Sequence, residues 1–298
     1  MRTYFNLFIS LTLNLVIFNI PAYASSHWDA ELYKKNSVKL QQFTALEVIS
    51  KVKFKGTEHI LDIGCGDGKI TKILAERVPY GKVLGIDISE SMIKLAHQLQ
   101  TENLHFSISN SERLLTKEKF DLIFSFFCIQ WVENKQQAFY EISNHLGERG
   151  KVYLIMTNRN PHLLAGRKNI FNSIKWNVFY KDYKDTTDVI DNDDYLTYAT
   201  QAGLKNVKFK KFVRRIDFDS YEELKTFITM VTPSINILPN EQLKQEFIKE
   251  LVAYYLNDIN PINASTNYIE YEIYQVHTSN NETLGLETFD CPILGSEA

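Results

Sequence analysis

The residues best placed to do chemistry form an alternating run of acids and glycines in the segment LDIGCGDG. Asp62 is followed by a glycine at every second position, and Asp67 lies inside the turn. Glycine loops that follow a strand often hold phosphate through backbone N–H groups. Two carboxylates in such a loop would repel phosphate, so the sequence favours a different ligand. The glycines are Gly64, Gly66 and Gly68.

The spacing excludes two common classes of glycine loop. A P-loop requires GxxxxGK[ST], but Ile63 stands five residues before Gly68, and Ile70 follows Lys69. A dinucleotide fingerprint requires G-x-G-x-x-G, and counting from the first glycine puts Lys69 at the third glycine position. S-adenosylmethionine suits the pattern better, because it carries a sulfonium and an α-ammonium and no phosphate.

A further acid, Asp87, ends the strand pattern KVLGID that follows the glycine loop. In dinucleotide-binding folds an acid at the end of the second strand accepts hydrogen bonds from the ribose hydroxyls. The same geometry would hold the ribose of S-adenosylmethionine. The loop and Asp87 together therefore predict a nucleoside cofactor at one edge of a sheet.

Alternating strands and helices must position these residues. Short apolar strands separated by helices of ten or more residues predict a parallel sheet with helices on both faces. The expected strands are 59–64, 82–87, 104–109, 120–129 and 151–157, and the expected helices are 31–52, 69–78, 91–100 and 134–147.

In the second half of the chain the regular alternation of short strands and helices ends. Residues 206–218 and 267–278 predict two long strands that pair as a hairpin. Helical patterns at about 158–200 and 220–257 predict a cap over the carboxyl edge of the sheet, where ligands bind in open α/β folds. We therefore expect a doubly wound α/β sheet, mostly parallel, with a C-terminal antiparallel hairpin, a helical cap and a tail at 281–298.

Three motifs resemble the class I S-adenosylmethionine-dependent methyltransferases: LDIGCGDG, GIDIS followed by MI and A, and FDLIFS followed by Trp. The resemblance spans roughly residues 28–280. Within this class the chain is similar to the trans-aconitate methyltransferases and, more closely, to the insect juvenile hormone acid methyltransferases, through ELYKKNS, IFSFFCIQWV and TPSINILP. The resemblance implies a Rossmann-like fold, S-adenosylmethionine as methyl donor, and O-methylation of the carboxylate of a small or medium organic acid.

The resemblance also assigns the cofactor site. The glycine loop takes the methionine end, Asp87 takes the ribose, and Ile88 and Met92 lie against the adenine. Asn110 and Ser111 stand where an acid usually meets the adenine amino group, and the Asn110 oxygen accepts that bond without charge assistance. The full set is Asp62, Gly64, Cys65, Gly66, Asp87, Ile88, Met92, Asn110 and Ser111.

Gln41 and Trp131 align with residues that position the substrate carboxylate in the juvenile hormone enzymes. Gln42 is a rival for Gln41, because the alignment there needs an insertion, and Gln130 replaces a common His. A carboxylate is already anionic at neutral pH, so methyl transfer requires its orientation and desolvation rather than a general base. Gln41 and the Trp131 indole N–H, both neutral donors, suit that task.

Other interpretations stay open at this point. Core packing explains a Trp after a buried strand, and a Gln on a helix surface needs no ligand. One alternative function is methylation of an acyl carboxylate on a carrier protein, which would dock on the basic residues between 205 and 215. Another is a non-catalytic protein that binds the cofactor. The composition does not decide between these alternatives.

The overall composition limits the classes of partner and cofactor that the chain could bind. A chain of 298 residues with net charge −3 and a pI of about 6.2 is not typical of nucleic-acid binders. Three cysteines without a framework spacing do not predict disulfides, and no His, Cys and Asp cluster has metal-ligand spacing. We expect a small-molecule carboxylic acid as substrate, no metal and no nucleic-acid partner.

The first residues are typical of a secretory signal peptide. Arg2 precedes an apolar stretch, and Pro21 and small residues follow it. We expect a signal peptide at 1–24, cleavage after Ala24, export, and a methyltransferase domain at 25–280 with no stable membrane insertion. A membrane anchor or a cytoplasmic protein are the alternatives, and the oligomeric state is left open.

Overall fold

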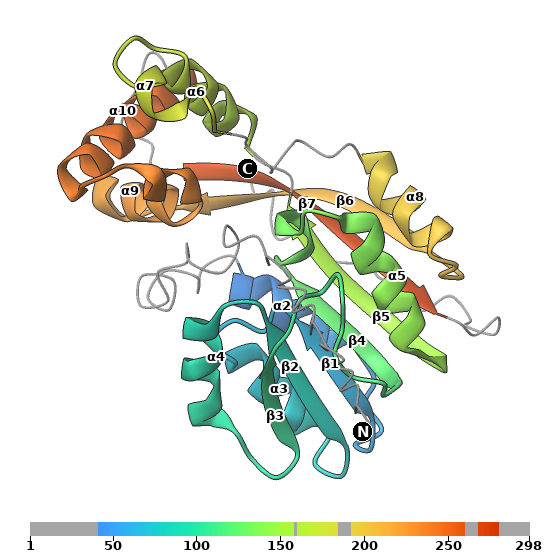
Figure 1. Ribbon diagram of the computed structural model, residues 1–298. Helices are drawn as coiled ribbons and strands as arrows, with labels where there is room; N and C mark the ends of the chain where they lie inside the picture. Colours follow the sequence, from blue (N-terminus) through green and yellow to red (C-terminus); the bar gives the residue numbers. More distant parts are fainter. Residues whose placement is uncertain (1–40, 158–159, 184–191, 260–267, 280–298) are drawn as a thin grey trace, which may run out of the picture.

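The computed structural model describes residues 41–157, 160–183, 192–259 and 268–279. Within them, one sheet has seven strands in the order β3-β2-β1-β4-β5-β7-β6 (Figure 1). Strands β1 to β5 pair in parallel, and β7 pairs antiparallel with both β5 and β6. The expected mostly parallel sheet with a C-terminal hairpin is confirmed. The strands are β1 (His59–Ile63), β2 (Lys82–Asp87), β3 (Leu104–Ile108), β4 (Phe120–Phe126), β5 (Leu146–Thr157), β6 (Lys208–Asp217) and β7 (Tyr268–Ser279).

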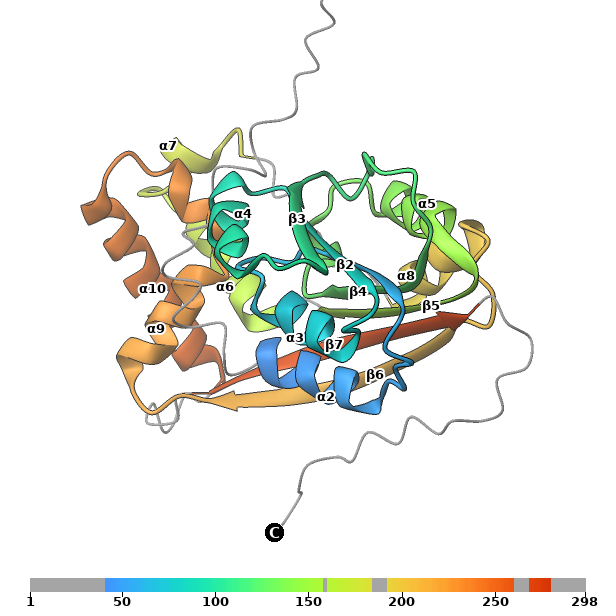
Figure 2. The same ribbon diagram turned by 90° about the horizontal axis from the view of Figure 1, so that it is seen from below.

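Helices cover both faces of this sheet (Figures 1 and 2). The central strands are apolar on both sides, because each face is buried under helices. Helices α2 (Phe43–Lys51), α3 (Lys69–Arg77) and α4 (Glu90–Ala96) pack on the face that carries Phe124 and Tyr153. Helices α5 (Lys135–His145) and α8 (Asn192–Gln201) pack on the opposite face.

Helix α8 differs from the expectation that residues 158–200 belong to the cap. Its Tyr195 and Ala199 are buried against the α5 side of the sheet, where the Tyr195 ring lies 6.4 Å from the Phe139 ring. An amphipathic pattern predicts that a helix has a buried face, but it does not say which layer covers that face.

The cap is a separate group of helices at the far end of the β6–β7 hairpin (Figure 1). Aromatic contacts hold it together: Phe171 stacks on Tyr180 at 4.1 Å, and Trp176 meets Phe247 edge-on at 5.4 Å, measured between ring centroids. The Trp176 indole nitrogen donates to Glu250 at 2.6 Å. The elements are α6 (Pro161–Phe171), α7 (Asn177–Tyr180), α9 (Tyr221–Met230), η4 (Pro233–Ile237) and α10 (Glu241–Ile259).

Several element boundaries differ from the sequence expectation, among them the ends of β4 and α5. Strand β4 ends at Phe126, because Phe127 adopts a left-handed conformation with φ of 56°. Helix α5 ends at His145 rather than at Gly147, because β5 already begins at Leu146, which pairs with the start of β4.

The N-terminal expectations fall outside the described residues. The signal peptide at 1–24 and its cleavage site lie there, as does the tail at 281–298. Among the helices of the described ranges, none is long and apolar enough to cross a membrane.

The loop between β1 and α3 requires glycine at Gly64 for two independent reasons. Its φ is +76°, a conformation that costs residues with a Cβ atom about 1–2 kcal/mol. A Cβ atom at Gly64 would also stand 2.3 Å from the Cβ atom of Cys128 and 2.5 Å from its sulfur. The loop therefore lies directly against the end of β4.

We expect Gly64→Ala to lower the free energy of unfolding by about 2–5 kcal/mol, since overpacking adds about 1–3 kcal/mol to the conformational cost of about 1–2 kcal/mol. Gly203→Ala is the matched control: Gly203 has φ of +80°, but nothing lies within 4 Å of an added Cβ atom. Urea denaturation of both variants separates the conformational cost from the cost of overpacking. Equal losses would show that the contact with Cys128 adds nothing.

Candidate functional site

The Asp87 carboxylate ties the glycine loop to the end of β2. Its Oδ2 accepts a hydrogen bond from the Gly66 N–H at 3.0 Å, and its Oδ1 accepts one from the Ser89 N–H at 2.9 Å. The Gly64 and Cys65 N–H groups both donate to the Ile86 carbonyl, at 2.8 and 2.9 Å. The loop is therefore already folded around this carboxylate.

Asp62 lies inside β1, between Gly85 of β2 and Phe124 of β4. Its side chain is 2% exposed and accepts a hydrogen bond from the Thr71 hydroxyl of α3 at 2.7 Å. Burial raises the pKa of Asp62 to about 7; the Thr71 bond opposes the rise, and the charge of Asp87 adds to it. Ionised Asp62 would gain free energy from a nearby cation.

The other titratable groups of the loop follow the same pattern. Burial raises the pKa of Asp87, and the N–H groups of Ser89 and Gly66 oppose that rise. Burial and then the two carboxylates raise the pKa of the Cys65 and Cys128 thiols. Neither thiol is therefore a thiolate nucleophile at neutral pH. The arrangement concentrates negative charge, which fits a cationic ligand and not a phosphate.

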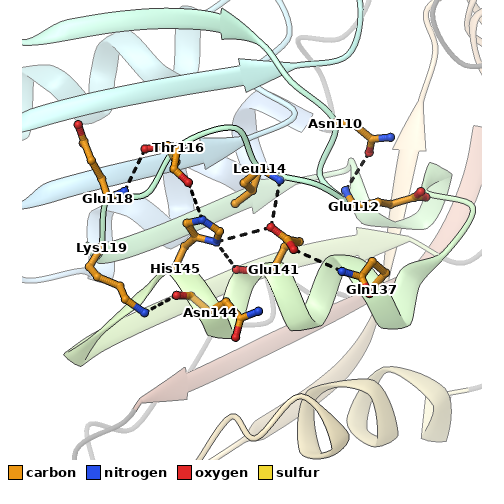
Figure 3. Close-up of polar contacts among 10 residues, drawn as sticks. All are labelled: Asn110, Glu112, Leu114, Thr116, Glu118, Lys119, Gln137, Glu141, Asn144 and His145. Carbon is orange, nitrogen blue, oxygen red and sulfur yellow. Dashed lines mark hydrogen bonds and ion pairs between the residues drawn. The ribbon is translucent and has the colours of Figure 1, made fainter. Parts of the chain in front are cut away.

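The residues expected at the adenine lie on two neighbouring segments. Ile88 is half-buried after β2, and Met92 is 4% exposed on α4, whose N-terminus is capped by the Ser89 hydroxyl. Asn110 and Ser111 follow β3 and are both half-buried. The Asn110 side-chain oxygen already accepts the Glu112 N–H at 2.8 Å, so one of its two lone pairs is used (Figure 3).

The segment after Asn110 is anchored on α5 (Figure 3). The Glu141 carboxylate accepts the Leu114 N–H at 3.0 Å. The His145 ring contacts the Thr116 carbonyl at 3.0 Å through Nε2 and the Glu141 carbonyl at 2.8 Å through Nδ1. The segment that follows Asn110 and Ser111 is therefore held by α5, on the face of the sheet opposite α2, α3 and α4.

Gln41 and Trp131, the residues expected to hold the substrate, come from separate segments. Trp131 ends the short helix η3 (Ile129–Trp131) after β4. Its backbone N–H donates to the Cys128 carbonyl at 2.9 Å. Gln41 and Gln42 form the turn that enters α2, and all three side chains are half-buried. Since α2 leads back to the start of β1, its first residues lie toward the carboxyl edge of the sheet.

Helix α2 is fixed to the hairpin by an ion pair. The Arg214 guanidinium of β6 contacts the Glu47 carboxylate and lies 5.4 Å from the centre of the Phe43 ring. This contact joins the segment that carries Gln41 to the hairpin that carries the cap.

Three residues of the site were missed by sequence reasoning. Thr71 holds Asp62 from α3, Cys128 packs on Gly64, and Phe127 turns the chain by its φ of 56°. Residues other than glycine rarely adopt this conformation, and it is costly for bulky ones. No local pattern marks these residues, because each depends on a contact between distant segments.

The comparisons with known proteins agree with this geometry. The methyltransferase domain family matches residues 54–203. Protein 235L of Invertebrate iridescent virus 6, named as a methyltransferase, is 30% identical over 243 residues, 82% of this chain and 91% of that protein. Juvenile hormone acid O-methyltransferase of Bombyx mori is 32% identical over 160 residues, which cover 50% of this chain and 57% of that enzyme.

Two further similarities extend the picture. Trans-aconitate 2-methyltransferase of Escherichia coli O1:K1 / APEC is 26% identical over 157 residues, 53% of this chain and 60% of that enzyme. The crystal structure of the YcgJ protein of Bacillus subtilis shares the fold, with a TM-score of 0.56 and 15% identity over 81% of this chain and 99% of that one. The chain therefore belongs to the methyltransferase domain family and is an S-adenosylmethionine-dependent methyltransferase with a Rossmann-like fold.

Proposed function

We propose that this enzyme methylates the carboxylate of a small or medium organic acid with an apolar body. The observation that carries the proposal is the position of Trp131. Its turn begins at Cys128, whose side chain packs on Gly64 in the cofactor loop. The similarity to enzymes named for juvenile hormone acid and trans-aconitate supports a carboxylate as the methyl acceptor.

The chain's residues fit S-adenosylmethionine as the methyl donor. In this proposal Asp62 and the glycine loop hold the charged methionine end, and Asp87 accepts the ribose hydroxyls. Ile88, Met92, Asn110 and Ser111 surround the adenine. When bound, the cofactor supplies an electrophilic methyl group on a sulfonium.

The substrate carboxylate needs orientation. The Gln41 amide and the Trp131 indole N–H donate to one carboxylate oxygen, so the other oxygen faces the methyl group. Because both donors are neutral, they orient the anion without neutralising its charge. The apolar residues of the cap and hairpin would exclude water from the acid, which strengthens its nucleophilicity.

The charges of the hairpin favour a free acid over an acyl group on a carrier protein. Docking of an acidic carrier would need unpaired basic residues on β6. Lys211 instead pairs with Glu272 at 2.5 Å, and Arg215 pairs with Asp217 at 2.7 Å. Arg214 is engaged by Glu47. Most of the positive charge of this strand is therefore balanced within the chain.

We expect Asp87→Ala to weaken binding of S-adenosylmethionine and S-adenosylhomocysteine by about ten- to a hundred-fold, since the ribose and the loop both lose a charged acceptor. Asp67→Ala is the matched control: it removes a carboxylate from the same turn whose partner is Lys69, and should cost less than about fivefold. Calorimetry measures both. Equal affinity of wild type and Asp87→Ala would remove Asp87 from the site.

The raised pKa of Asp62, about 7, predicts pH-dependent cofactor binding. A bound cation favours the ionised carboxylate, so binding near or below pH 7 releases a proton from Asp62. Affinity should therefore rise with pH up to about 7 and level off above it, changing by up to about tenfold per pH unit below that value.

Calorimetry in buffers of different ionisation enthalpy measures the released proton. Asp62→Asn cannot ionise and should flatten the pH profile, which separates the titration of Asp62 from that of the cofactor's own amino group. A profile that is unchanged in Asp62→Asn would contradict the assignment.

Trp131→Phe keeps most of the packing but deletes the indole N–H. If that donor orients the carboxylate, turnover should fall by about ten- to a thousand-fold, or roughly 1.4–4 kcal/mol of transition-state stabilisation, with cofactor affinity unchanged. Steady-state kinetics on an accepted acid provide the test. Undiminished turnover would leave Trp131 as a packing residue.

A pair of glutamine variants gives the matched comparison. Gln41→Ala should lower turnover in the same way, and Gln42→Ala should not. The opposite result would move the role to Gln42. A product methylated on nitrogen would overturn the proposed substrate class.

A further inference from the structure

One buried phenol of the hairpin has its polar atom unsatisfied. Tyr271 of β7 is 6% exposed, and its hydroxyl has no hydrogen-bond partner among the described residues. A buried hydroxyl without a partner costs about 1–3 kcal/mol, and buried polar groups in folded proteins nearly always have one. Such a group therefore indicates a missing partner.

Other aromatic residues around the cap show that the region can satisfy such groups. The Tyr255 hydroxyl donates to the Tyr268 carbonyl at 2.9 Å, and the Tyr180 hydroxyl donates to the Ser234 carbonyl at 3.1 Å. The hydroxyl of Ser234 itself is 2% exposed and, like that of Tyr271, has no partner in the described part of the chain. Tyr271 and Ser234 thus carry two buried hydroxyls of this region that lack a partner among the described residues.

The strand register places Tyr271 beyond the carboxyl edge of the sheet. The last pair between β5 and β7 joins Thr157 to Ile273, and Tyr271 lies two residues further along, opposite Arg214. Two residues of a strand span about 7 Å and return the side chain to the same face. Tyr271 therefore stands above the edge where the cofactor loop lies.

The same face carries the cofactor loop's buried acid. Ile273 and Tyr271 belong to one apolar cluster with Phe124. Phe124 is the register partner of Asp62. Tyr271 and Asp62 therefore lie on the same side of the sheet, with Tyr271 on the part of the hairpin that extends beyond its carboxyl edge.

A cation supports the phenol. Arg167 of α6 is 5% exposed, and its neighbour Gly166 packs against Leu251 and Tyr254 of α10. Burial raises the pKa of Tyr271, the neighbouring Tyr255 hydroxyl adds to the rise, and the Arg167 guanidinium opposes it. The phenol therefore stays protonated as a donor, beside a positive charge that attracts an oxygen acceptor.

We infer that Tyr271, beside Arg167, is a specificity-determining residue that donates a hydrogen bond to an oxygen acceptor at the far end of the acid. This inference rests on the proposed carboxylate methylation. The preferred substrate then has two oxygen-bearing ends joined by an apolar body. One end is the carboxylate that receives the methyl group, and the other is a carbonyl or a second carboxylate at Tyr271.

The test compares three acids of equal length in the full-length protein and in Tyr271→Phe: decanoic acid, 9-oxodecanoic acid and decanedioic acid. We expect the wild type to prefer the acids with a distal oxygen, and the variant to lose about five- to thirty-fold of that preference in kcat/KM. Turnover of decanoic acid should be unchanged. A preference for the keto acid indicates a neutral acceptor, and one for the diacid indicates a second carboxylate.

Stability measurements separate this role from a structural one. Tyr271→Phe removes an unsatisfied hydroxyl, so its Tm should hold or rise. Tyr180→Phe, the matched control, removes a satisfied hydroxyl, so its Tm should fall while its preference among the acids is unchanged. Equal loss on all three acids in Tyr271→Phe, or a fall in its Tm like that of the control, would overturn the inference alone. No turnover of any acid by wild type would overturn the proposed function as well.

Discussion

The structure depends on holding two carboxylates, Asp62 and Asp87, at the carboxyl edge of an apolar sheet. Burial works against their charge, and the chain offsets this cost with donors: the Gly66 and Ser89 N–H groups for Asp87, and the Thr71 hydroxyl for Asp62. The offset is incomplete, since both pKa values stay raised. In the proposed site a cationic ligand would supply the missing stabilisation, and the electrostatic cost of the free protein would become binding free energy for the cofactor.

The hydrogen bond between the Gly66 backbone and the Asp87 carboxylate determines the conformation of the rest of the loop. The Gly66 N–H reaches Asp87 only if the chain turns through left-handed conformations, which glycine adopts without strain. The same turn brings Gly64 against Cys128, and Cys128 begins the turn that ends at Trp131. The cofactor loop and the segment proposed to hold the substrate are thus built on one contact, so a change in one would displace the other.

Local patterns in the sequence were enough to predict the strands, the glycine turn and the place of Asp87 at the end of β2, because alternation, strand length and glycine spacing are properties of neighbouring residues. The features that the sequence did not predict depend on contacts between distant segments. The end of β4 depends on the left-handed Phe127, and the end of α5 depends on the pairing of Leu146 with Phe120. The position of α8 follows from the packing of Tyr195 near Phe139, which an amphipathic pattern does not specify.

Buried polar groups have hydrogen-bond partners at one end of the proposed substrate path and lack them at the other. At the loop, backbone donors satisfy Asp87 before a ligand arrives, which preorganises the site for a cofactor that every turnover uses. Under the cap, the hydroxyls of Tyr271 and Ser234 are buried without partners in the described residues. An apolar wall rejects a wrong ligand weakly, whereas a buried donor left unpaired by a wrong ligand rejects it strongly. If the enzyme methylates acids as proposed, a modest loss of stability at the cap would be offset by better selection among acids that share the same reactive carboxylate.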